Sequence, residues 1–326
     1  MRVLVTGGAG YIGSHTAKAL SKDGIDPVVF DNLSRGHAEA VKWGPLVNGD
    51  LCEPQSIRRA LSDYRIEAVI HFAAYAYVGE SVQEPRKYFE NNVANSLHLL
   101  DAMLDAGVKR IVFSSTCATY GLPERLPIRE DHPQRPVNPY GEAKLFVERA
   151  MQWYERAYGL QWVALRYFNA AGADLDGEIG EVHSPETHLI PLAAQAALGG
   201  APLRIFGTDY PTRDGTAIRD YIHVSDLADA HVKALHYLEA EGKSAAFNLG
   251  TGRGYSVREV VNAVSRISRR SVPLVEAARR AGDPPELVAD ASVANAALDW
   301  QCRNSDLDTI CETALNWQRR IGFRRD

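Results

Sequence analysis

Cysteine is scarce in this chain of 326 residues: four occur, and no two of them form a Cys-x-x-Cys pair. Thiols so few and so widely separated make neither a disulfide framework nor a zinc site of the usual spacing. We therefore predict reduced, mostly buried side chains for Cys52, Cys117, Cys302 and Cys311.

Long apolar runs are also missing. The longest uncharged stretches are strand-sized and fall short of the ~20 apolar residues that a membrane helix needs. The start of the chain lacks the apolar run and small-residue cleavage site of a signal peptide. We expect a cytoplasmic protein with no membrane partner.

Positive charge is not in excess, because 36 Lys and Arg stand against 41 Asp and Glu and give a formal net charge of −5. No basic run stands out and the tryptophans are not interleaved with basic residues, so nucleic acid is not expected as a partner. Any anionic ligand must be held by local groups. The hydrophobic share of 45% and the charged share of 24% are typical of a globular chain and exclude disorder.

Short apolar runs alternate with segments of helical period through the first half of the chain. This order predicts an α/β protein with a doubly wound, Rossmann-type parallel sheet that is covered on both faces. The expected strands are residues 2–6, 27–30, 68–72, 110–115 and 162–166, and the expected helices are residues 14–21, 55–63, 88–106 and 139–158.

The texture changes after Asn169, where Gly, Pro and Asp become frequent. We predict a first domain of residues 1–169 and a smaller C-terminal lobe of residues 170–326. Residues 220–240 are expected to return to the first domain, since a strand-like segment there is followed by Ser225 as a candidate N-cap of a helix.

A glycine motif, Gly7-x-x-Gly10-x-x-Gly13, lies between the first predicted strand and the first predicted helix. Glycines let the backbone approach a pyrophosphate, and a helix N-terminus attracts an anion. Asp31 ends the next predicted strand, where a carboxylate accepts ribose hydroxyls and repels a 2′-phosphate. The motif therefore predicts NAD rather than NADP.

A second motif, Tyr140-Gly-Glu-Ala-Lys144, lies on a predicted helix and follows a strand that ends in Ser-Ser-Thr116. Residues four apart share a helix face, so the Lys144 ammonium can favour the phenolate of Tyr140. This makes Tyr140 a candidate general base, and Thr116 a candidate hydrogen-bond donor to the same substrate oxygen.

These motifs resemble those of the extended short-chain dehydrogenase/reductase superfamily and, within it, of the UDP-galactose (UDP-glucose) 4-epimerases. The resemblance covers almost the whole chain, whereas distant superfamily members share only the first lobe. The narrower likeness depends on segments of the second lobe: Phe206-Gly207, Asp209-Tyr210-Pro211-Thr212, residues 219–224, residues 248–252 and residues 279–283.

The resemblance implies an NAD-dependent isomerase that interconverts UDP-glucose and UDP-galactose by inverting C4 through a 4-keto intermediate. Residues 1–169 are then the NAD-binding Rossmann domain, and residues 170–326 the substrate-binding lobe. The resemblance also implies a homodimer formed through the long helices that begin near Tyr88 and Pro139.

The same resemblance assigns individual residues. It implies proton transfer by Tyr140, orientation of the NAD ribose by Lys144 and a catalytic hydroxyl on Thr116. The implied NAD contacts are Gly7, Gly10, Tyr11, Ile12, Gly13, Asp31, Asn32, Asp50, Leu51, Phe72, Ala73, Ala74, Asn92, Ser114, Tyr140, Lys144 and Tyr167. The implied UDP-sugar contacts are Thr116, Asn169, His188, Leu189, Phe206, Arg219, Tyr221, Arg280, Asp283 and Leu287.

Some positions depart from the family pattern. Ala76 stands where many members have Lys, and His188 where they commonly have Asn. Leu287 stands where some members carry Tyr and others a small residue, so acceptance of N-acetylated sugars is open. No metal is expected: His183 and His188 flank Glu186 in an apparent loop without ligands at helical spacing, and ordinary loop residues are favoured.

Three other functions stay open. A UDP-xylose/UDP-arabinose 4-epimerase would use the same residues. A nucleotide-sugar 4,6-dehydratase adds an acidic pair after the catalytic Thr, whereas Thr116 is followed here by Cys117-Ala118. A non-catalytic NAD-sensing module is disfavoured because Thr116, Tyr140 and Lys144 are all present.

Overall fold

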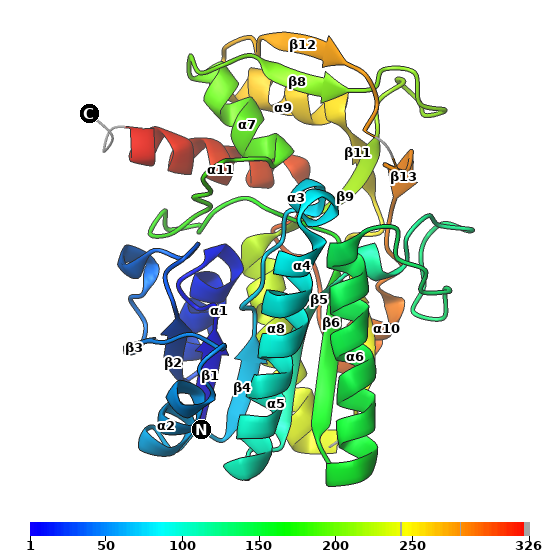
Figure 1. Ribbon diagram of the computed structural model, residues 1–326. Coiled ribbons are helices and arrows are strands. Elements are labelled where there is room, and N and C mark those ends of the chain that lie inside the picture. Colours follow the sequence, from blue (N-terminus) through cyan, green and yellow to red (C-terminus); the bar gives the residue numbers. More distant parts are fainter. Residues whose placement is uncertain (242, 281, 323–326) are drawn as a thin grey trace.

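A seven-stranded parallel sheet forms the centre of the larger of the two lobes of the protein (Figure 1). The computed structural model describes residues 1–241, 243–280 and 282–322. The strand order is β3-β2-β1-β4-β5-β6-β10, and every neighbouring pair is parallel. The strands are β1 (Arg2–Thr6), β2 (Asp26–Asp31), β3 (Leu46–Asn48), β4 (Ala68–His71), β5 (Arg110–Thr116), β6 (Gln161–Tyr167) and β10 (Ala245–Leu249). The predicted doubly wound fold is confirmed.

Both faces of this sheet are buried because successive side chains of a strand point to opposite sides. In β1, Val3 and Val5 belong to one apolar cluster and Leu4 to another. The first cluster lies under α1 (Tyr11–Lys22), α8 (Val224–Glu241) and α10 (Ser292–Leu298). The second lies under α2 (Pro54–Asp63), α5 (Asn95–Asp105) and α6 (Pro139–Tyr158).

The helix expected over residues 88–106 is interrupted in the structure. It consists of α4 (Pro85–Tyr88), a π-helical turn (Phe89–Ala94) and α5. Asn92 in this turn uses its amide to bind Tyr75, accepting from its N–H at 2.9 Å and donating to its C=O at 2.9 Å. This side-chain contact holds a neighbouring loop, which periodicity does not indicate. The short β3, the helix α3 (Val78–Gln83) and the 3₁₀ turns Ala38–Ala40 and Cys117–Thr119 were also not expected.

A second lobe lies above the carboxyl ends of the large sheet (Figure 1). Its helices α7 (Leu189–Ala197), α9 (Val257–Ser268) and α11 (Leu307–Gly322) enclose an apolar core that includes Ile190, Val260 and Ile310. One small sheet has the order β11-β9-β13 with β7 beside β9, and β8 pairs with β12. These strands are β7 (Asn169–Ala171), β8 (Leu203–Phe206), β9 (Ile218–His223), β11 (Gly254–Ser256), β12 (Leu274–Ala277) and β13 (Glu286–Leu287).

The chain returns from the second lobe to the large sheet through β9, α8 and β10. Helix α8 begins at Val224, so Ser225 lies in its first turn and is not the N-cap that the sequence suggested. The backbone N–H of Ser225 instead donates to Nδ1 of His223, at 3.1 Å. The boundary at residue 169 stays a prediction.

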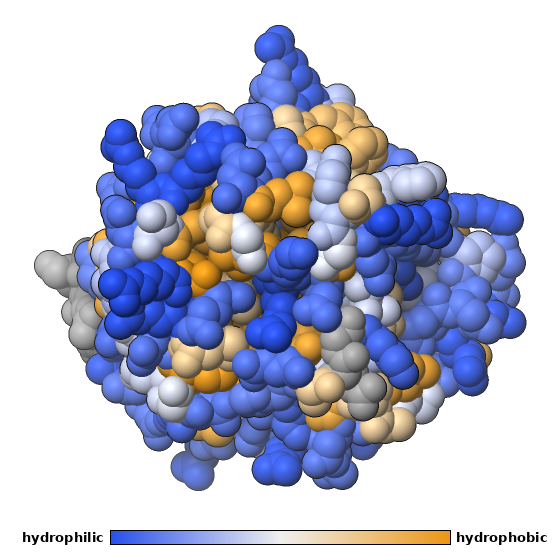
Figure 2. All heavy atoms as spheres, turned by 90° about the horizontal axis from the view of Figure 1, so that it is seen from below, coloured by the Kyte–Doolittle hydropathy of each residue, from blue (hydrophilic) through white to orange (hydrophobic). Residues whose placement is uncertain are grey.

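The underside of the larger lobe exposes apolar side chains singly and in small groups among hydrophilic ones (Figure 2). Exposed apolar residues scattered in this way are normal on a protein surface. Within the described residues, no helix is both long and apolar enough to cross a membrane.

Candidate active site

A cavity of about 1430 Å³ extends from the carboxyl edge of the large sheet into the second lobe. Its wall includes every residue predicted to bind NAD except Asn92, and every residue predicted to bind the UDP-sugar. From the first set these are Gly7, Gly10, Tyr11, Ile12, Gly13, Asp31, Asn32, Asp50, Leu51, Phe72, Ala73, Ala74, Ser114, Tyr140, Lys144 and Tyr167. From the second they are Thr116, Asn169, His188, Leu189, Phe206, Arg219, Tyr221, Arg280, Asp283 and Leu287.

Asn92 lies outside this wall. Its side chain is buried and holds Tyr75, which does line the cavity. In the structure Asn92 therefore positions a wall residue and does not itself face the cavity.

The glycine turn between β1 and α1 is built for close backbone approach. Gly7 has φ +71°, and a Cβ on it would lie 2.6 Å from the backbone nitrogen of Ala73. A Cβ on Gly13 would lie 2.3 Å from the carbonyl oxygen of Gly7. Gly10 is the N-cap of α1, and no side chain caps the helix there. This bare helix N-terminus on the cavity wall fits the pyrophosphate of a dinucleotide.

Asp31 ends β2 beside this turn. Its Oδ2 accepts from the N–H of Ala9 at 3.0 Å and its Oδ1 from the N–H of Leu33 at 2.8 Å. Burial raises the pKa of Asp31, and these two hydrogen bonds oppose the rise. The carboxylate is thus held in a fixed position, with lone pairs left over for ribose hydroxyls.

The Tyr-x-x-x-Lys pair lies in the first turns of α6, one turn apart. Asn138 caps this helix by accepting from the N–H of Gly141 at 2.9 Å, which fixes where the first turn begins. Tyr140 is 8% exposed, and Lys144 is buried with its Nζ donating to the carbonyl of Ser114 at 2.7 Å. Thr116, at the end of β5, lines the same cavity, and its hydroxyl oxygen accepts from the N–H of Ala118 at 3.1 Å.

The electrostatics of this pair differ from the expectation. Burial raises the pKa of Tyr140 well above its usual value, nearby Tyr167 adds to the rise, and the Thr116 side chain opposes it. Burial lowers the pKa of Lys144 to about 7. The protein environment alone therefore does not produce the lowered Tyr140 pKa that the spacing suggested, because desolvation exceeds the other influences.

The far end of the cavity carries the charged groups of the second lobe. Arg219 on β9 donates to Oδ1 of Asp283 at 2.5 Å. The guanidinium of Arg280 lies 4.1 Å from the centre of the Phe206 ring. Leu287 on β13 pairs with Arg219 in register. Two guanidinium groups beside an apolar ring suit a diphosphate next to a flat base.

The sequence analysis missed part of the wall. Tyr75, Tyr77 and Glu80 line the cavity near Arg35, whose guanidinium lies 5.7 Å from the Tyr75 ring centre and 5.4 Å from that of Tyr77. No motif marks Tyr75 or Tyr77. The only signal was their place just after the third strand of the predicted sheet, where ligands of this architecture bind.

Comparison with known proteins identifies the family of this chain. The chain belongs to the NAD dependent epimerase/dehydratase family, whose model matches residues 3–250. Among its relatives is the UDP-glucose 4-epimerase of Rhizobium meliloti (strain 1021), which is 52% identical over 319 residues, 98% of this chain and 97% of that protein.

Two solved structures agree with this finding. The UDP-glucose 4-epimerase of Brucella ovis in complex with NAD has a TM-score of 0.94 and 56% identity, covering 96% of this chain and 97% of that one. The UDP-glucose-4-epimerase of Stenotrophomonas maltophila, with bound NAD and formylated UDP-arabinopyranose, has a TM-score of 0.96 and 40% identity and covers 99% of each chain. The predicted family is confirmed.

Proposed function

We propose that this protein is a UDP-glucose 4-epimerase that uses bound NAD to interconvert UDP-glucose and UDP-galactose. The observation that carries the proposal is one continuous cavity that joins the glycine turn and Asp31 to Tyr140 and Lys144, and these to Arg219. The full-length similarity to UDP-glucose 4-epimerases supports it.

The geometry already described supports contacts to the cofactor at its pyrophosphate and its adenosine ribose. The N-terminus of α1 would hold the pyrophosphate and the Asp31 carboxylate would accept from the adenosine ribose, while Lys144 would orient the second ribose, as the family resemblance implies. NAD, when bound, supplies a hydride acceptor that becomes the donor in the second half of the reaction.

The remaining chemistry belongs to side chains. In its phenolate form, which the Lys144 ammonium favours, Tyr140 takes up the proton of the sugar 4-hydroxyl and becomes a hydroxyl, and it returns that proton after the 4-keto sugar has turned over. Thr116 donates a hydrogen bond to the same oxygen. Arg219 and Arg280 hold the diphosphate meanwhile, so that remote binding energy retains the sugar as it turns.

The dehydratase alternative finds little support in the cavity. Cys117 and Ala118, the residues after Thr116, both line it, and neither is an acid. Burial raises the pKa of Cys117 to about 12, so its thiol stays protonated and is a poor proton donor.

The deciding experiment incubates the purified protein with UDP-galactose or UDP-xylose, without added NAD, and resolves the sugar nucleotides by chromatography. We expect UDP-galactose to yield UDP-glucose. A 4-keto-6-deoxy product would establish the dehydratase instead, and faster turnover of UDP-xylose would establish the pentose enzyme. If neither sugar nucleotide is converted, with or without added NAD, both the UDP-glucose and the UDP-xylose epimerase are refuted.

We also propose a homodimer, since α6 and the helical segment before α5 expose large apolar side chains. Phe146 is 49% exposed and Trp153 is 66% exposed, and seven residues place them on one face of α6. Phe89 adds a 41% exposed ring. Analytical ultracentrifugation should give a dimer for the wild type and for the control Val293→Glu, and a monomer for Trp153→Glu; a monomeric wild type would refute the dimer.

A further inference from the structure

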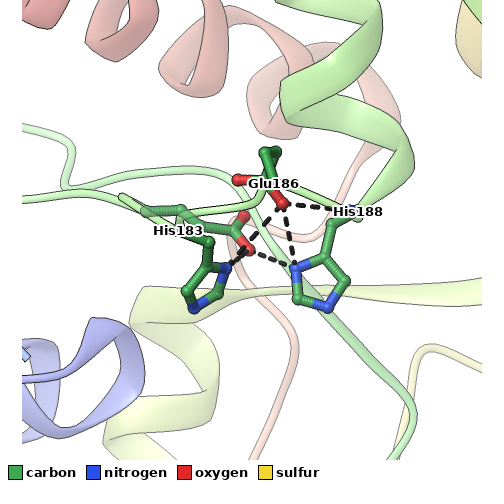
Figure 3. A group of neighbouring side chains, drawn as sticks. His183, Glu186 and His188 are labelled. Atoms are coloured by element: carbon green, nitrogen blue, oxygen red, sulfur yellow. Dashed lines mark hydrogen bonds and ion pairs between the residues drawn. The ribbon is translucent and has the colours of Figure 1, made fainter. Parts of the chain in front are cut away.

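Four side chains of the segment 181–188 lie together next to the cavity: Glu181, His183, Glu186 and His188. Figure 3 shows how the last three point toward one another. Each contributes one candidate ligand atom, the Nδ1 of each histidine and one oxygen of each carboxylate. These four atoms all lie within 4.8 Å of one another. The sequence favoured ordinary loop residues here, since nothing in the spacing brought Glu181 to the other three.

The separations match the edges of a small coordination tetrahedron. His183 Nδ1 lies 3.0 Å from Glu181 Oε1 and 3.8 Å from Glu186 Oε1. His188 Nδ1 lies 3.5 Å from Glu186 Oε1 and closer still to Glu181 Oε1. Zinc bonds of about 2.0–2.2 Å in a tetrahedron place neighbouring ligand atoms about 3.4 Å apart. A single ion can therefore reach all four atoms with small side-chain adjustments.

The charge of the four side chains is compatible with a divalent cation. The side chains of Glu181 and Glu186 are 3% and 7% exposed. Across residues 1–241, 243–280 and 282–322, the ion-pair partners of these two carboxylates are His183 and His188 alone. When both imidazoles are neutral, as metal ligation requires, the two buried carboxylates leave a charge of −2 that one divalent ion would balance.

One ring nitrogen is oriented toward the cluster. His183 Nδ1 forms an ion pair with Glu181 Oε1 at 3.0 Å, although it makes no hydrogen bond within the described residues. A metal ion between the two side chains would use this nitrogen as a ligand.

The ligands are held in place before any ion binds. Glu186 Oε1 accepts from the backbone N–H of Thr187 at 2.8 Å and of His188 at 2.9 Å. The carbonyl of Glu181 accepts from Nε1 of Trp317 at 3.0 Å, which ties this end of the segment to α11. Such supporting contacts orient metal ligands in protein sites.

We propose that Glu181, His183, Glu186 and His188 bind one divalent transition-metal ion, and that Zn²⁺ is the best match. Two imidazole nitrogens and two carboxylate oxygens in a four-coordinate arrangement suit Zn²⁺, whereas Mg²⁺ and Ca²⁺ select oxygen ligands in larger number. His183, Glu186 and His188 line the cavity, so the ion would fix the shape of its wall. Its role is to position this segment and not to take part in epimerisation.

The test measures bound metal and not activity, so that it is independent of the proposed function. Purified full-length protein is stripped with a chelator, dialysed against Zn²⁺ and analysed for metal content. We expect one Zn²⁺ per chain for the wild type and less than a tenth of that for Glu181→Gln and His183→Ala. The matched control is His236→Ala, since His236 also faces two carboxylates, Asp23 at 2.6 Å and Glu239 at 3.4 Å, but on the exposed surface; it should retain the ion.

A second measurement covers variants that fold poorly. Co²⁺ added to the stripped wild type should give the intense visible absorption of a tetrahedral site, and Zn²⁺ should displace it. Equal Zn²⁺ content in the wild type and both ligand variants would overturn the proposal. So would a wild type without Zn²⁺, a weak octahedral Co²⁺ spectrum, or Mg²⁺ that displaces Zn²⁺ at similar concentration.

Discussion

Replacing Tyr140 with Phe removes one oxygen and leaves the ring in place. The ring is 8% exposed in the first turn of α6, and Phe keeps its apolar contacts there. The hydroxyl oxygen of Thr116, which lies near this ring, accepts from the N–H of Ala118 at 3.1 Å and does not depend on Tyr140 for a partner. Thr116 thus keeps a partner, and the free energy of unfolding should fall by only about 0.5–1.5 kcal/mol.

The effect of the same change on turnover should be much larger. A positioned general acid or base contributes about 10²–10⁴ in rate, and at about 1.4 kcal/mol per tenfold this corresponds to about 3–5 kcal/mol of activation free energy. The two losses differ enough to be separated. The variant should stay folded and bind UDP almost normally. The residues proposed to contact the diphosphate, Arg219 and Arg280, do not lie on α6.

Three measurements test this argument: kcat with UDP-galactose, the affinity for UDP by calorimetry and the melting temperature. Tyr158→Phe is the matched control, since Tyr158 lies at the opposite end of α6 and is 55% exposed. A kcat for Tyr140→Phe within threefold of the wild type would remove Tyr140 from proton transfer. A parallel loss of UDP affinity would mean that the change had disturbed the fold.

Three further outcomes are expected. Lys144→Met should raise the Tyr140 pKa, since a nearby positive charge is lost; the pH–rate profile should then move to higher pH, at about tenfold in rate per unit of pKa, and an unmoved profile would contradict this. Asp31 should make NAD preferred over NADP, because two like charges about 4 Å apart at a partly buried site cost on the order of 4 kcal/mol; equal activation by the two cofactors would refute the assignment. Leu287→Tyr should suppress turnover of N-acetylated UDP-sugars selectively and Leu287→Gly should increase it, since added ring volume cannot enter a packed site; an unchanged substrate ratio in both would place Leu287 away from the sugar.

The features that the sequence predicted well are local ones. The glycine turn and the Tyr140–Lys144 spacing each depend on a few consecutive residues, so the pattern and the geometry coincide. The strand runs were equally legible, because strands buried on both faces read as continuous apolar segments.

The features that were missed depend on contacts between distant residues. Asn92 matched a family pattern, but its amide is taken up by the backbone of Tyr75, and that contact does not show in the sequence. The sequence analysis inferred a lowered pKa for Tyr140 from Lys144 alone, whereas burial of the ring in the structure raises that pKa. The convergence of Glu181 with His183 depends on the path of a loop, which has no periodicity to read.

The two halves of the cavity are joined through helix α1. Its N-terminus forms the proposed pyrophosphate site, and its Tyr11 hydroxyl donates to the carbonyl of Gly172 at 2.7 Å, just after β7. Two turns further along the same helix, Lys18 Nζ donates to both carboxylate oxygens of Asp174 at 2.8 Å.

The same helix packs along α8, which follows β9 directly in the chain (Figure 1). Strand β9 carries Arg219, a predicted diphosphate contact. Helix α1 therefore contacts both the segment after β7 and helix α8, and so connects the glycine turn at its own N-terminus to strand β9. A sugar that turns over between two hydride transfers needs a fixed distance between its nucleotide anchor and the cofactor, and these contacts give the fold a rigid means to hold that distance.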